Sequence, residues 1–104
     1  MKWTPYDING SIFRPMGKLL LVEEPDFGCE GVPEEEPVYG SVVVQKRGEQ
    51  KTHTVPIEEN ILFSGRMDDG MWYGILGGRM VLVERDQKTV IAPNDAERQW
   101  LEQL

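Results

Sequence analysis

Lys18-Leu19-Leu20-Leu21-Val22-Glu23-Glu24 is the stretch that decides the fold, and Gly40-Ser41-Val42-Val43-Val44-Gln45 repeats its character. Both are short runs of leucine and valine with charged residues or glycine at their ends, which is typical of β-strands. Each apolar run is continuous instead of alternating with polar residues. We therefore expect both faces of these strands to be covered, one by a barrel interior and the other by a further surface such as another subunit.

The rest of the chain has the same rhythm, since glycine or proline recurs about every eight to twelve residues, as in β-sandwiches and barrels. Asp-Gly within Met67-Asp68-Asp69-Gly70 and the pair Gly77-Gly78 are hairpin signals. The sequence thus predicts an all-β fold. Its expected strands are 18–24, 40–45, 52–55, 60–63, 71–76, 79–84 and 89–92.

Two segments break this rhythm. Residues 23–37 are acidic and proline-rich and too long for a tight turn, which predicts a mobile surface loop. Near the other end, Asn94 followed by Glu97 resembles a capping box, which predicts a short closing helix. Its expected apolar stripe is Ala96, Trp100 and Leu104 with Leu101 beside them, and its expected polar remainder is Glu97, Arg98, Glu102 and Gln103.

Composition limits the classes of partner. With 104 residues, of which 39% are hydrophobic, the chain predicts one domain. Eighteen acidic against eleven basic residues give a net charge of -7, which disfavours nucleic acid and anionic membranes as partners. The apolar runs are far shorter than the ~20 residues that span a bilayer. No secretory signal is visible, so we expect a cytoplasmic protein, and the one cysteine fits a reducing compartment.

The sequence shows no catalytic or metal-binding pattern. His53 is the one histidine and lies in a polar stretch, which favours an exposed position on a loop or edge strand. A zinc site needs three or four cysteine or histidine ligands, which one of each cannot supply. The carboxylates of Glu34-Glu35-Glu36 and Glu58-Glu59 are consecutive, which favours a solvated face over a paired acid and base. We therefore expect no enzyme, no cofactor and no metal.

Aromatic residues indicate where the chain buries surface. Trp72 lies on an expected strand and favours a core or subunit interface, and Trp100 is the expected anchor of the helix. Trp3 and Tyr6 precede the first expected strand, so they either fold back over an apolar groove or dock onto a neighbouring chain. The candidate oligomer interface is Trp3, Tyr6, Trp72, Trp100 and Leu104.

Four segments share their order and spacing with a known family. Ile12-Phe13-Arg14-Pro15-Met16-Gly17-Lys18-Leu19-Leu20-Leu21-Val22 is similar to an opening Arg-Pro-Leu-x-x-x-φ-φ-φ, where φ is apolar. Tyr39-Gly40-Ser41-Val42-Val43-Val44 is similar to a Gly-x-Val strand, and Val55-Pro56-Ile57-Glu58-Glu59-Asn60-Ile61-Leu62-Phe63 to Val-x-x-Gly-Asp-x-Val-φ-Phe. Arg79-Met80-Val81-Leu82-Val83-Glu84-Arg85-Asp86-Gln87-Lys88-Thr89-Val90-Ile91-Ala92 is similar to a closing hairpin. Over residues 12–92 the chain thus resembles the GroES-like co-chaperonins.

This resemblance implies a partly open β-barrel that assembles as a homo-oligomeric, heptameric ring. The ring would cap a chaperonin, which binds the ATP, and assist protein folding. The implied contact is the mobile loop 25–38, and 46–54, with its basic side chains, is the implied roof hairpin. The implied chaperonin-binding residues are Phe27, Gly28, Cys29, Glu30, Gly31, Val32 and Pro33.

The chain also departs from the family. Cys29-Glu30-Gly31-Val32-Pro33 stands where the family has Gly-Gly-Ile/Val-φ-φ, and Glu59-Asn60 replaces Gly-Asp. An arm over 1–11 and the helix over 93–104 are additions. Such divergence is typical of a bacteriophage-encoded version. It leaves open a second hypothesis, an oligomeric phage structural or assembly protein that reuses the small barrel and has no chaperonin partner.

Overall fold

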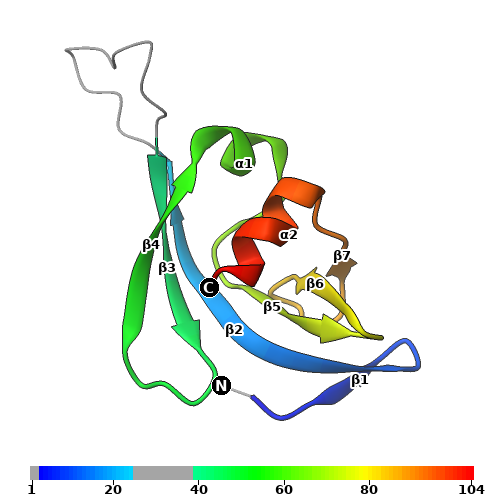
Figure 1. The fold of residues 1–104 in the computed structure, drawn as a ribbon. Helices are drawn as coiled ribbons and strands as arrows, with labels where there is room; N and C mark the ends of the chain where they lie inside the picture. The colour runs from blue at the N-terminus through cyan, green and yellow to red at the C-terminus, as the bar shows by residue number, and fades with distance from the viewer. Residues whose placement is uncertain (1–2, 25–38) are drawn as a thin grey trace, which may run out of the picture.

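The computed structural model describes residues 3–24 and 39–104, which form one antiparallel sheet and two short helices (Figure 1). The strands lie in the order β4-β3-β2-β5-β6-β7, and β1 pairs with β2. Within the described ranges, β4 and β7 at the two ends of this order do not pair, so the sheet is not closed. The elements are β1 (Tyr6–Ile8), β2 (Ser11–Glu23), β3 (Tyr39–Lys46), β4 (Thr52–Glu58), α1 (Glu59–Ser64), β5 (Met71–Leu76), β6 (Arg79–Val83), β7 (Val90–Ile91) and α2 (Asp95–Glu102).

β2 joins the two halves of the sheet. It is 13 residues long and pairs with β5 on one edge and with β3 and β1 on the other. Its register with β5 shifts between Pro15 and Gly17, so Met16 is a bulge. One extra residue reverses which side chains face inward. Phe13 and Leu19 therefore lie in different apolar clusters, although they are six positions apart, a spacing that would place them on the same face of a regular strand.

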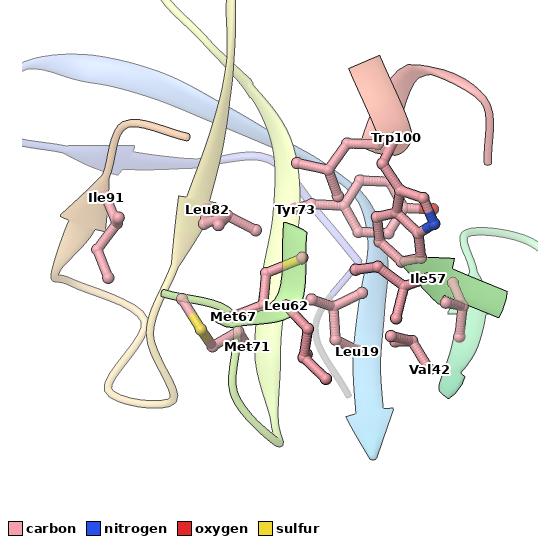
Figure 2. Close-up of a cluster of buried hydrophobic side chains, with 12 residues drawn as sticks. Leu19, Val42, Ile57, Leu62, Met67, Met71, Tyr73, Leu82, Ile91 and Trp100 are labelled. Atoms are coloured by element: carbon pink, nitrogen blue, oxygen red, sulfur yellow. The ribbon is translucent and has the colours of Figure 1, made fainter. Parts of the chain in front are cut away.

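The main core lies on the sheet face that α2 covers, and strands from both halves contribute to it (Figure 2). α2 closes it with Trp100 and Leu101, which are 7% and 1% exposed. Burying one large apolar side chain contributes roughly 1.5–3 kcal/mol, so the helix is part of the core. The buried members are Leu19, Val42, Val44, Ile57, Leu62, Met67, Met71, Tyr73, Leu82, Ile91, Trp100 and Leu101.

A second apolar cluster lies on the opposite face, because successive strand side chains alternate and Trp72 points away from its neighbours in the main core. The N-terminal arm covers it. Trp3 meets Trp72 edge-to-face with ring centroids 5.1 Å apart, and Tyr6 meets Phe13 at 5.6 Å. Of the two placements left open by the sequence, the arm thus folds back over its own chain.

β1 lies in the predicted N-terminal arm, and β2 begins at Ser11, seven residues before the predicted first strand at 18–24. The turn between them is Asn9-Gly10, with φ of 52° and 90°. This dipeptide is the favoured two-residue hairpin turn, so the signal was present in the sequence. β5 has the predicted bounds, β3, β6 and β7 agree within one residue at each end, and β4 continues beyond 52–55 to Glu58.

The prediction of a strand at 60–63 is wrong, because these residues lie in α1. Ile61 and Leu62 pack against the main core while Phe63 is 57% exposed. A short apolar run has no period that separates a strand from a helical turn. Because a helix precedes it, Met67-Asp68-Asp69-Gly70 leads into β5 and is not the turn of a hairpin, whereas Gly77-Gly78 does join β5 to β6 with positive φ at both residues.

The predicted closing helix is confirmed as α2, including its capping box. The Asn94 side chain accepts a hydrogen bond from the Glu97 backbone N–H at 2.8 Å, and Glu97 Oε1 accepts one from the Asn94 backbone N–H at 3.0 Å. Two details of the predicted stripe are wrong, since Ala96 is exposed and Glu97 is 2% exposed. In the described part of the chain, neither helix is long and apolar enough to cross a membrane.

β4 forms one edge of the sheet, and α2 is attached to this edge. The Trp100 Nε1–H donates to the Pro56 carbonyl at 3.0 Å. A proline is tolerated in a strand where its nitrogen faces away from the neighbouring strand. Its carbonyl then points outward as well, which makes it available to Trp100.

Tyr73 makes the stability of the fold sensitive to alkaline pH. Burial, and secondly the negative charge of Glu49, raise the pKa of Tyr73 above its ordinary value of 10.0. The neutral phenol is therefore favoured in the folded state, and its contribution is complete below pH 10.0 and lost as pH rises above that value. We expect the urea midpoint of unfolding to be lower at about pH 11 than at about pH 8, and this difference to be smaller in Tyr73→Phe. An equal difference in the two proteins would contradict this assignment.

Candidate functional site

The predicted chaperonin-binding residues, Phe27 to Pro33, lie outside the described residues, so their role stays a prediction. The structure does describe the two strands that flank 25–38. β2 ends at Glu23 and β3 begins at Tyr39, and Glu23 pairs with Ser41 in the sheet (Figure 1). The Ser41 hydroxyl donates to Glu23 Oε2 at 3.3 Å. The segment therefore leaves and re-enters the sheet at adjacent positions of one sheet end.

Apolar side chains are exposed beside these two positions. Tyr39 and Leu21 are 50% and 39% exposed. Leu21 pairs with Val43 on the face opposite the main core, whereas Val22 pairs with Val42 on the core side. Both faces of these strands were expected to be covered. Among the described residues, Val42 and Val44 on the core side are buried and Val22 is partly buried, whereas Leu21 on the opposite face is exposed.

Tyr39 also lines a shallow groove. It has a volume of about 450 Å³ and lies between β4, α1 and α2. Its apolar walls are Tyr39, Pro56, Ile61, Ala96 and Trp100, and its polar rim is Glu58, Asn60, Gln99 and Gln103. Side chains from the chain end and from the middle of the sequence thus meet at the base of 25–38.

The turn before β5 holds the end of β2 in place. Asp69 Oδ1 accepts a hydrogen bond from the Val22 N–H at 2.6 Å, and the Gly70 N–H donates to the Leu19 carbonyl at 2.7 Å. The Asp-Gly turn is visible in the sequence, but this role of Asp69 is not. No local pattern shows it, because 47 positions separate the two residues.

The residues predicted for an oligomer interface lie within the chain's own apolar clusters. Trp72 is 3% exposed and packs with Trp3 and Tyr6, which are partly buried. Trp100 is buried in the main core, and Leu104 packs against it. An intersubunit role for these residues stays a prediction.

Tyr6 carries an orphaned polar group in the second cluster. Its hydroxyl is buried and has no hydrogen-bond partner among the described residues. Burial, and secondly the charge of Asp86, raise the pKa of Tyr6 above its ordinary value. Asp86 itself has a lowered pKa, because the Thr89 hydroxyl and the backbone N–H groups of Thr89 and Lys88 donate to its carboxylate.

The segment predicted as a roof hairpin contains the turn between β3 and β4. His53 lies on the edge strand and is exposed, as expected, and its Nε2 lies 2.6 Å from Glu49 Oε2. The Arg47 N–H donates to the Met16 carbonyl at 2.9 Å, which ties the turn to the bulge of β2. Over residues 3–24 and 39–104 there is no group of three or more His, Cys, Asp or Glu side chains that could hold a metal ion.

Comparison of the chain with protein-family models, with curated proteins and with solved structures gave no match.

Proposed function

We propose that this chain is a subunit of a ring-forming, GroES-like co-chaperonin that binds a chaperonin through residues 27–33. One structural observation carries the proposal: the strands that precede and follow 25–38 are adjacent and pair with each other at one end of the sheet. A binding loop needs such a rigid base, because its two ends are then fixed relative to the partner. The order of family-like segments over 12–92 supports the same function.

The architecture is compatible with the partly open barrel that this function requires. The sheet is unclosed, and β2 carries two register shifts, which bend a strand and increase its twist. The chain would work by binding, and the chaperonin would supply the nucleotide chemistry. Weak contacts repeated around a heptameric ring give high avidity without tight binding at any one site.

The test combines native mass with chaperonin binding. We expect the purified protein to have the mass of a ring by native mass spectrometry and to co-elute with a chaperonin when ATP is present. Val32→Asp should abolish co-elution, because an unpaired carboxylate buried in an apolar contact with the chaperonin costs on the order of 2 kcal/mol or more at each site. The mass of the ring should not change.

Val32→Ile is the matched control, since it keeps an apolar side chain of similar size and should still co-elute. Binding that survives Val32→Asp would refute the loop assignment. A wild-type ring that never co-elutes with a chaperonin would refute the proposed function itself.

The second candidate is an oligomeric phage assembly protein. Exposed apolar side chains favour it, since Ile12, Met16 and Phe63 are 51%, 42% and 57% exposed. This second candidate predicts a stable oligomer that does not bind a chaperonin. Deleting α2 is not a usable test of it, because Trp100 and Leu101 belong to the core and the shortened chain would lose its fold.

A further inference from the structure

The end of β2 that leads into 25–38 has a strand on one edge only. β3 pairs with this end as far as Glu23. On the other edge, pairing with β5 stops at Leu19, which lies opposite Met71. From Leu20 to Glu23, no described strand lies on that edge. A strand end with one open edge frays more readily than a fully paired one.

The turn before β5 occupies this open edge. The carboxylate of Asp69 accepts a hydrogen bond from the Val22 N–H at 2.6 Å, and the Gly70 N–H donates one to the Leu19 carbonyl at 2.7 Å. These two bonds flank Leu20, where the register with β3 shifts. Hydrogen bonds to a charged acceptor are about twice as strong as neutral ones.

The turn is itself held in shape. Gly70 has a φ of +81°, and a Cβ at this position would lie 2.7 Å from the Arg85 side chain. Arg85 also reaches Asp68 Oδ2 at 3.8 Å, where both side chains are 70% exposed. Within the turn, the Asp69 N–H donates to Asp68 Oδ1 at 2.8 Å and the Met71 N–H donates to the Asp68 carbonyl at 3.4 Å. The backbone that presents the Asp69 carboxylate to β2 is thus hydrogen-bonded on both sides.

We infer that Asp69 is a positioning residue, whose carboxylate substitutes for the missing strand and fixes the direction in which the chain leaves β2 toward 25–38. What this means for chaperonin binding rests on the proposed function. A fixed base lowers the ordering cost that the segment incurs on binding. A frayed base would add that cost at every subunit of the ring.

The first test measures amide hydrogen exchange in the free, full-length protein. In Asp69→Ala, exchange of the Val22 amide should become about tenfold to a hundredfold faster, as expected for losing one bond to a charged acceptor. Asp69→Asn keeps an acceptor oxygen and should lose less protection. Asp69→Glu keeps the charge but displaces the carboxylate, and should resemble Ala.

Glu102→Ala is the control for loss of charge, because it removes one exposed carboxylate from α2, away from the turn before β5, and should leave Val22 protected. Unchanged exchange at Val22 in both Asp69→Ala and Asp69→Glu would overturn the inference, whatever the chaperonin assay shows.

The second test measures chaperonin binding by the same variants. Asp69→Ala should weaken binding about tenfold or more, with the native mass unchanged, and Asp69→Asn should largely restore it. Faster exchange with wild-type binding would overturn the positioning role. If the wild-type protein binds no chaperonin, the proposed function fails, and acceleration confined to the end of β2 then supports the inference on exchange alone.

Discussion

Gly74→Ala is expected to lower the free energy of unfolding by about 3 kcal/mol or more. Gly74 pairs with Pro15 immediately before the bulge of β2, and a Cβ would overlap the Arg14 carbonyl oxygen. The overlapped atom is backbone, so relief requires moving β2. A change of this size lowers the melting temperature of a domain this small by roughly 12 °C or more, which thermal unfolding would show.

Gly48→Ala is the matched control for this prediction. Gly48 has a φ of +81° and no atom within 4 Å of an added Cβ. Alanine there incurs the left-handed penalty of about 1–2 kcal/mol and no overlap. If the melting temperature of Gly74→Ala is no lower than that of Gly48→Ala, the bulged pairing between β2 and β5 is wrong.

Glu97→Ala is expected to cost about 3 kcal/mol, which is a large share of a small domain's stability. Its buried carboxylate accepts from the Asn94 N–H at 3.0 Å and from the Arg66 N–H at 3.1 Å. The change orphans both donors and detaches α2 from the chain that follows α1. Urea unfolding is the measurement. Glu97→Gln keeps one acceptor oxygen and should cost about half as much.

Two controls test this assignment. Glu102→Ala removes an exposed carboxylate from the same helix and should change stability by less than about 0.5 kcal/mol. Gly65→Ala should destabilise the wild type because its Cβ would overlap Glu97 Oε2. That cost should shrink in a Glu97→Ala background. Additive costs would show that the two residues do not meet.

Local patterns predicted the parts of this fold that depend on neighbours in sequence. The capping box of Asn94 and Glu97 is complete within four positions, so the helix and its start could be predicted. The turn Gly77-Gly78 needs no distant partner either. The strand assigned at 60–63 failed because its three apolar residues, Ile61, Leu62 and Phe63, pack equally well as one turn of helix.

Contacts between distant segments could not be predicted in this way. The bulge at Met16 lets β2 place Phe13 in one apolar cluster and Leu19 in the other. The sequence of β2 alone does not show it. The burial of Glu97 depends on the backbone of Arg66, and the role of Asp69 depends on Val22. Both acids occupy positions that a sequence pattern assigns to solvent.

The edge of β4 has a consequence for how the protein behaves in concentrated solution. Exposed sheet edges recruit other chains and start aggregates, above all in proteins with long valine-rich strands such as β3. Pro56 offers no N–H to an incoming strand, and its carbonyl is already taken by Trp100. We therefore expect strand addition along this edge to be interrupted at Pro56. The helix that completes the core would thus also protect the edge strand from pairing with another chain.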